Sequence, residues 1–308
     1  MPGGLGSVRP RMATFDTGPV SLRRTFLHWH NRILAIWGPC CMISMQASAI
    51  ETSFGLEPSW PVSGRVHALS TTRTGGVSSG RWGLASGAVG GLNLGAHCGD
   101  SSSDVAINRE RLVARLPGPP CWLEQVHGIT VFDADQAFDP RAAGPAPCAD
   151  ASITTRQGLV LAVLTADCLP ILLSSEDGEA VGAIHAGWRG LAAGVVEATL
   201  QALEQRCASR RWLAWLGPAI GPARFEVGQE VRDAFCAVDR EAHAAFSCAA
   251  KPGKWYADLY CLARQRLSAV GVTRVFGGGL CTVSDRERFY SYRRDRETGR
   301  MASLIWID

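Results

Sequence analysis

Apolar residues along the chain form short aliphatic runs that alternate with longer amphipathic segments. Residues 159–165 are almost wholly aliphatic and residues 180–185 are mostly apolar as well, a composition typical of strands covered on both faces. Residues 256–270 instead repeat apolar side chains at helical spacing, and a glycine turn leads into a second predicted helix at 191–206. This alternation predicts an α/β fold: a single domain with three α/β/α layers and a mixed sheet.

The rest of the chain from residue 61 onward supplies more elements of the same two kinds. Further strands are expected at residues 65–72, 121–126, 129–133, 151–155, 170–174, 214–216, 272–276 and 304–307. Further helices are expected at residues 105–116, after a polar cap at 101–104, and at 227–236. Glycine-rich turns and a Pro/Gly/Ala loop separate them.

The first 60 residues show neither the strand nor the helix spacing of apolar residues, and they contain frequent glycine and proline. We expect residues 1–60 to be a disordered extension, or to lie outside the true protein if Met42 or Met45 is the start. The apolar run 33–45 resembles a secretory signal but follows an unusually long charged region, and it is too short to span a bilayer. The catalytic domain is therefore expected at 61–308.

Charge and cysteine usage narrow the class of partner and the compartment. Lysine plus arginine outnumber aspartate plus glutamate by 31 − 28 = 3, a surplus too small for a nucleic-acid surface. Eleven cysteines form an odd set without a CxxC pair, which argues against both a disulfide framework and a structural zinc ribbon. We expect a cytoplasmic protein, a monomer or homodimer, that acts on small molecules and binds neither nucleic acid nor membrane.

Three residues near predicted turns form a candidate metal site: His127 in QVHG, Cys168 in TADCLP and His185 in GAIHAGWRG. One thiolate and two imidazoles are a ligand set for zinc with an open fourth position, where a water or substrate can bind. A lone cysteine in an apolar run is more often a small buried hydrophobe. The combination favours a metal, because Cys168 follows an aliphatic strand and His185 precedes a strand-to-helix turn, where the sites of α/β proteins gather.

Several motifs in order carry a family resemblance. They are NLG at 93–95, QVHG at 125–128, ADCLP at 166–170, HAGWRG at 185–190, GPAIG at 217–221, FEVG at 225–228, and FYSYRRD with TGRMASLIW near the end. Together they resemble the YfiH-like family, also called the laccase-domain or multicopper polyphenol oxidase family, purine nucleoside phosphorylase, and peptidoglycan editing factor. The resemblance covers about residues 65–308.

The resemblance implies a fold related to cysteine-hydrolase toxins and assigns His127, Cys168 and His185 as zinc ligands. The implied activity is phosphorolysis of adenosine, inosine, guanosine or S-methyl-5'-thioadenosine, with adenosine deamination alongside. Purine nucleoside and phosphate are then the binding partners. One departure from the family pattern is visible, because Arg224 and Phe225 stand where many members have a Cys-Tyr pair.

Four further residues have candidate roles around such a reaction. Arg73 and Arg189 are candidate phosphate ligands, since a guanidinium pairs with two phosphate oxygens, although both could be solvated surface side chains. Asn93 could bind ribose hydroxyls or cap a turn. Asp167 could orient a ligand histidine or transfer a proton, or could be purely structural.

Two other chemistries remain open. Copper-dependent phenol oxidation is the weaker one, since coupled copper centres need many histidines, and the chain has seven, with no HxH pair in the matched region. A cysteine hydrolase would use Cys168 as nucleophile and His185 as base, on an amide or a peptidoglycan precursor. A role in binding a partner without catalysis is a further alternative.

Overall fold

The computed structural model describes residues 1, 3–4, 49–52, 54–139 and 144–308, and its helices and strands belong to the unit Ser44–Asp308. The predictions for the apolar run 33–45 and for the two candidate start methionines lie outside the described residues. In the part of the chain that the structure describes, no helix is both long and apolar enough to cross a bilayer.

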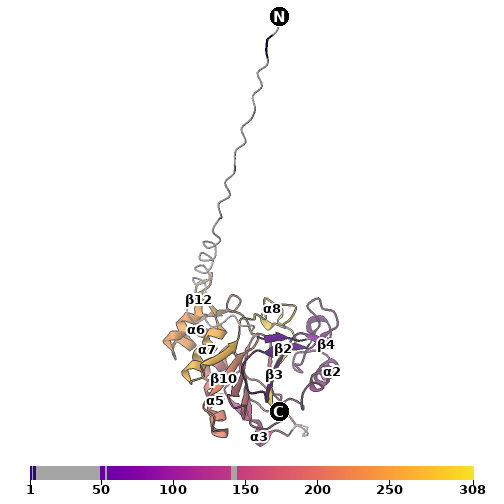
Figure 1. Ribbon diagram of the computed structural model, residues 1–308, viewed down its shortest axis with the longest axis vertical. Coiled ribbons are helices and arrows are strands. Elements are labelled where there is room, and N and C mark those ends of the chain that lie inside the picture. Colours follow the sequence, from indigo (N-terminus) through magenta and orange to yellow (C-terminus); the bar gives the residue numbers. More distant parts are fainter. Residues whose placement is uncertain (2, 5–48, 53, 140–143) are drawn as a thin grey trace. The chain divides into compact units, whose positions relative to one another are not determined.

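Strands and helices alternate along most of this unit (Figure 1). The strands are β1 Ala49–Glu51, β2 Gly55–Pro58, β3 Val66–Thr71, β4 Thr74–Ser78, β5 Val131–Asp133, β6 Ala151–Thr154, β7 Leu161–Thr165, β8 Leu169–Ser175, β9 Val181–Ala186, β10 Trp212–Leu216, β11 Glu226–Gly228, β12 Phe246–Cys248, β13 Lys254–Ala257, β14 Arg274–Gly277 and β15 Met301–Ile307. The helices are α2 Ser102–Val113, α3 Ala134–Ala137, α4 Trp188–Ala193, α5 Val195–Arg206, α6 Gln229–Cys236, α7 Leu259–Ala269 and α8 Tyr292–Asp295, with short 3₁₀ turns η2 Gly80–Trp82 and η3 Arg240–Ala245.

A six-stranded mixed sheet, in the order β14-β10-β8-β9-β6-β5, forms the centre of the fold. Its β10–β14 and β5–β6 pairs are parallel and the others antiparallel. Alternate side chains of β8 point to opposite faces. Leu169, Ile171 and Leu173 pack in the core shared with α4 to α7, and Leu172 packs in the core on the other side. This explains why residues 169–173 of the strand are apolar on both faces.

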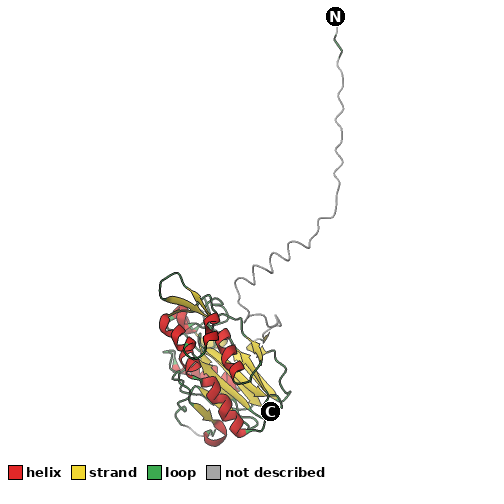
Figure 2. Ribbon diagram, turned by 90° about the vertical axis from the view of Figure 1, so that its left-hand side faces the viewer, coloured by secondary structure: helices red, strands yellow, loops and turns green. Residues whose placement is uncertain are grey.

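A second sheet covers that other face, in the order β1-β2-β3-β15-β7. Leu161 and Val163 of β7 pack toward Leu172, whereas Ala162 and Leu164 point away, into a core that includes Leu112 of α2. Figure 1 shows α5 and α7 beside β10, with α2 on the far side of β3, and Figure 2 shows helices lying over the strands.

The protein therefore has a mixed α/β fold with several sheets, because β11, β13 and β12 form a third one. The predicted mixed sheet is present, but a second sheet lies where the three-layer α/β/α prediction expects helices. The sequence cannot distinguish the two arrangements, because a strand buried on both faces is equally aliphatic under a helix or under another sheet.

Several element boundaries also differ from the predictions. Strands β1 and β2 pair antiparallel with each other and β2 pairs with β3, so the five-stranded sheet begins before residue 61. The predicted helix 191–206 is two helices, since Gly194 adopts a left-handed φ of 104° between α4 and α5. The start of the predicted helix 256–270 belongs to β13, and α7 begins only after Asp258, whose side chain accepts from two backbone N–H groups.

Candidate metal centre

The pairing of β8 with β9 brings Cys168 and His185 together. In this antiparallel pair Leu169 lies opposite Ala186 and Pro170 lies opposite His185, so Cys168, directly before β8, falls beside the end of β9. Asp167, the residue before Cys168, adopts a positive φ of 101°, a strained conformation of the kind that clusters at functional sites. The chain thus turns sharply where it presents the sulfur.

His127 reaches the same place from a loop before β5. Its φ of 62° is left-handed, which is uncommon for a residue other than glycine. The Asp150 carboxylate stabilises this turn by accepting hydrogen bonds from the backbone N–H groups of Val126, His127 and Gly128 at 3.2, 2.8 and 2.6 Å. Asp150 directly precedes β6, so a buried carboxylate at the start of β6 holds the loop that leads into the neighbouring strand β5.

The three potential ligand atoms lie within 4.8 Å of one another, and Cys168 Sγ is 3.7 Å from His127 Nε2. A tetrahedral zinc ion with ordinary bond lengths separates a sulfur and a nitrogen ligand by about 3.6 Å. The two imidazole rings meet edge to face with centroids 4.8 Å apart. His185 is buried, Cys168 half-buried and His127 exposed, so the cluster opens toward solvent on one side, where a substrate has access.

Two glycines of the HAGWRG motif leave room for this arrangement. A Cβ placed on Gly187 would lie 2.7 Å from Cδ2 of His127 and 3.2 Å from Sγ of Cys168. A Cβ on Gly190 would lie 2.7 Å from the carbonyl oxygen of Gly128. The first turn of α4 can therefore pack against the ligands only with glycine at these positions. The distances among the three ligand atoms and their chemistry fit a bound divalent metal.

The charges within the cluster are strongly coupled. Burial alone would raise the pKa of the Cys168 thiol, but the adjacent His185 and His127 lower it to about 6. Burial would lower the pKa of His185, but Cys168 and Asp150 raise it to about 9. Burial also opposes ionisation of Asp150, yet hydrogen bonds from His185 and from the backbone hold its pKa below the usual value. Near pH 7 the metal-free cluster is therefore a thiolate beside an imidazolium.

These pKa values predict a pH-dependent metal affinity. A metal needs the neutral imidazole of His185 and the thiolate of Cys168. The raised pKa of His185, about 9, makes binding displace one proton at neutral pH. The association constant should increase by about tenfold per pH unit between roughly pH 7 and 9 and then level off. Below about pH 6 it should fall more steeply, because Cys168 is also protonated there.

The metal affinity is measured at each pH by competition with a chelator whose own pH dependence is known. The protons released on metal binding are measured in weakly buffered solution. An affinity that stays constant between pH 7 and 9 would contradict the assigned charge state.

The contacts of Asp167 match the structural alternative among its predicted roles. Its buried carboxylate accepts hydrogen bonds from Thr282 Oγ1 and from the backbone N–H of Arg293, both at 2.6 Å, and its carbonyl accepts from Ile220 N–H at 2.9 Å. No hydrogen bond among the described residues joins Asp167 to a histidine. Asp167 instead ties the loops at Ile220 and Thr282 to the short helix α8, and the carboxylate that contacts His185 is Asp150.

The remaining predicted residues lie in three different environments. Arg73 is 3% exposed, donates from Nε to the carbonyl of Gly83 at 2.7 Å and packs over Tyr290, at the wall of a cavity of about 280 Å³. Asn93 is buried, and its amide is engaged by Gly95, Asp100 and Arg300, which is the turn-capping alternative. Arg189 is exposed, with its guanidinium 4.5 Å from the ring centre of Trp188.

Asp150 is the one residue of the cluster that sequence analysis missed. The sequence did hold a signal for Asp150. An ionisable residue directly before the buried strand Ala151–Thr154 is itself buried, and burying its charge costs free energy unless a partner pairs with it. Without knowledge of the β6–β9 pairing, however, nothing connects it to His185.

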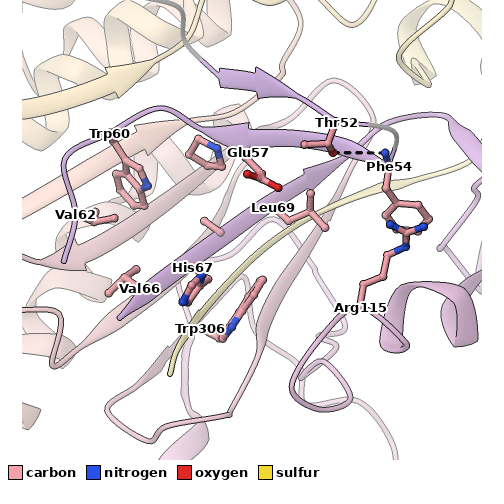
Figure 3. Close-up of a pocket in the computed structure, with 12 residues that line it drawn as sticks. Thr52, Phe54, Glu57, Trp60, Val62, Val66, His67, Leu69, Arg115 and Trp306 are labelled. Carbon is pink, nitrogen blue, oxygen red and sulfur yellow. Dashed lines mark hydrogen bonds between the residues drawn. The ribbon is translucent and has the colours of Figure 1, made fainter. Parts of the chain in front are cut away.

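A separate hollow of about 370 Å³ lies on the five-stranded sheet β1-β2-β3-β15-β7 (Figure 3). His67 stacks on Trp306 with ring centroids 5.6 Å apart, and Arg115 packs over Phe54. None of the three candidate ligands lines it. The candidate chemistry is therefore assigned to the cluster and not to this hollow.

The chain is similar in sequence and structure to several known bacterial proteins. Residues 67–308 match the model of the family described as multi-copper polyphenol oxidoreductase laccase. A Pseudomonas aeruginosa protein named purine nucleoside phosphorylase is 52% identical over 252 residues, which span 82% of this chain and 98% of the relative. Purine nucleoside phosphorylase YfiH of Escherichia coli is 51% identical over 252 residues, 81% of this chain and 97% of its own. A solved Neisseria meningitidis protein is 46% identical with a TM-score of 0.76, covering 83% of this chain and 100% of that one.

Proposed function

The chain belongs to the multi-copper polyphenol oxidoreductase laccase family, and from that premise we propose that it is a zinc-dependent purine nucleoside phosphorylase. The substrates are adenosine, inosine, guanosine and S-methyl-5'-thioadenosine, with adenosine deamination as an accompanying activity. The observation that carries the proposal is the convergence of His127, Cys168 and His185 on one point. The names of the similar bacterial proteins support the reaction type.

In phosphorolysis a phosphate oxygen bonds to ribose C1′ while the bond from C1′ to the purine nitrogen breaks. The electron pair leaves with the purine, which then takes up a proton. Zinc, when bound, supplies a Lewis acid that can stabilise the negative charge developing on the departing base. His127, Cys168 and His185 would hold it, and the exposed side of His127 leaves the approach open.

The surroundings of the cluster suit such a substrate. Val126 and Ile129, on either side of the exposed ligand loop, are 53% and 44% exposed and offer apolar surface for a flat purine ring. Arg189 lies near the start of α4, four residues after His185, and its guanidinium suits a phosphate. Arg73 is a second candidate phosphate ligand, since its buried guanidinium lines a separate cavity with Arg81 and Arg286, although Asp295 and Glu297 line that cavity too.

The test is incubation of metal-assayed protein with adenosine, with and without phosphate, followed by identification of the products. The proposal expects free adenine and ribose 1-phosphate only when phosphate is present, and inosine from the deamination. Adenine release at the same rate with and without phosphate would contradict the proposal. So would the absence of adenine release from protein that holds stoichiometric zinc. We place the enzyme in the cytoplasm, as a monomer or homodimer, with zinc rather than copper as its metal.

Replacement of Arg189 separates the two reactions. Arg189→Ala should raise the KM for phosphate by about tenfold or more, because a charge-assisted hydrogen-bond pair is lost. Adenosine deamination, which uses no phosphate, should change by less than about twofold. Arg210→Ala is the control, since Arg210 is also exposed and its hydrogen bonds to the carbonyls of Cys207 and Ser209 involve neighbouring backbone away from the three candidate ligands. Equal losses of both activities in Arg189→Ala would remove its phosphate role.

A second function is favoured by one specific contact. Asp150 accepts from His185 Nδ1 at 2.8 Å, and His185 in turn lies beside Cys168, an order that matches the Cys-His-Asp arrangement of cysteine hydrolases. The lowered pKa of Cys168 also suits a nucleophile. Such an enzyme would cleave an amide bond, including one in a peptidoglycan precursor. This activity would agree with the predicted relation of the fold to that of cysteine-hydrolase toxins. It would work without metal, so full activity after zinc removal would favour it.

A further inference from the structure

We propose that Asp150 is the positioning residue for both histidine ligands, holding His185 by its ring and His127 by its backbone. This inference rests on the metal site of the proposed function, but not on its substrate or reaction.

The contacts of Asp150 saturate its carboxylate. One oxygen accepts from His185 Nδ1 and from the N–H of His127, both at 2.8 Å. The other accepts from the N–H groups of Gly128 and Val126, at 2.6 and 3.2 Å. Its side chain is 0% exposed, so neither water nor substrate reaches it. All four acceptor positions of the carboxylate are occupied, which makes Asp150 a group that orients others and not one that touches substrate.

The contact with His185 selects which ring nitrogen faces the metal position. An ionised carboxylate can only accept, so Nδ1 must carry the hydrogen. Nε2 is then the atom available as a ligand, on the side of the ring toward Cys168. Histidine ligands are commonly fixed in this way by a carboxylate partner, which sets both the tautomer and the ring orientation.

The contact with the loop fixes His127 by a different means. Three consecutive backbone N–H groups point into one carboxylate, an anion-binding concavity formed where the backbone turns left-handed. The φ of 62° at His127 is unfavourable by itself and needs such compensation. The His127 residue is exposed on one side, so its place beside Cys168 depends strongly on the backbone turn.

The main variant is Asp150→Asn, which keeps the shape but replaces one acceptor oxygen with an NH₂ donor. In one orientation of the amide, His185 Nδ1 and the N–H of His127 lose their acceptor. In the other, the N–H groups of Val126 and Gly128 on either side of His127 lose theirs, so the ligand loop is weakened either way. We expect the zinc affinity, measured by competition with a chromogenic chelator, to fall by about 10- to 100-fold.

A matched control is Asp135→Asn. The Asp135 side chain is 5% exposed and accepts hydrogen bonds from Thr154 and Thr155 at the far end of the same strand. Its loss should lower the thermal stability in a similar way but leave zinc affinity within about twofold. A folded Asp150→Asn protein with wild-type zinc affinity, or an equal loss in the Asp135 variant, would overturn the proposal.

A second measurement uses the metal-free wild-type chain and does not depend on a variant that folds. Nuclear magnetic resonance should show a slowly exchanging Nδ1 proton on His185, and the amide protons of His127 and Gly128 should be protected from hydrogen exchange despite their surface loop. Fast exchange of these protons would overturn the proposal.

The outcomes separate this inference from the proposed function. Wild-type protein that binds zinc tightly but yields no adenine from adenosine and phosphate would end the proposed function and leave the role of Asp150 intact. Phosphate-dependent adenine release, together with an Asp150→Asn protein that holds zinc as tightly as wild type, would do the reverse.

Discussion

Cys168→Ala is expected to abolish stable zinc binding, and with it both phosphorolysis and deamination, while the fold survives. The sulfur is the only anionic atom of the three candidate ligands. If a complete zinc site contributes roughly 10–16 kcal/mol, one ligand accounts for about 3 kcal/mol, on the order of a 100-fold loss of affinity or more. The side chain is half-buried at the edge of the sheet, so its truncation removes little packing.

The experiment measures zinc content, adenine release and the melting temperature for Cys168→Ala beside Cys236→Ala. Cys236 is also half-buried, at the end of α6, and serves as a control for loss of a thiol away from the cluster. Stoichiometric zinc and wild-type turnover in Cys168→Ala would refute the metal site. Retained zinc with lost activity would favour Cys168 as a nucleophile, and so the cysteine hydrolase.

The sequence predicts the elements that carry the ligands better than the elements around them. The run 159–165 and the segment around His185 are nearly continuous aliphatic strands, and a strand of this kind is visible locally from its composition alone. Strand β4, by contrast, lies outside the predicted strands, because its Thr-Gly-Gly sequence has weak strand propensity and gains its structure from tertiary pairing.

What the sequence could not predict depends on which strands become neighbours. The antiparallel register of β6 with β9 sets Asp150 beside His185, and no local pattern carries that register. The same limit affects Asp167, whose carboxylate contacts Thr282 and the backbone of Arg293, both more than a hundred residues later. Adjacency to Cys168 in the sequence suggested contact with a ligand, but the turn at Asp167 directs its side chain elsewhere.

Replacement of Gly187 gives the second large effect that we expect. Gly187→Ala should lower zinc affinity by about 10- to 100-fold without a matching loss of stability. The backbone at Gly187, with φ −63° and ψ 154°, is extended and open to any residue, so the effect is steric and not conformational. The added Cβ would lie 2.7 Å from a ring atom of His127, well inside van der Waals contact.

The atoms that must yield to this Cβ are those of the ligands. Helix α4 cannot retreat from the added methyl group at little cost, because Leu191 is fully buried. The exposed ring of His127 can rotate toward solvent, which relieves the clash but removes it from the metal position. Gly118→Ala is the control, since its Cβ would meet only the Gly158 carbonyl, at 3.5 Å. Zinc titration and thermal unfolding of both variants test this, and wild-type zinc affinity in Gly187→Ala would show that His127 is not a ligand held against α4.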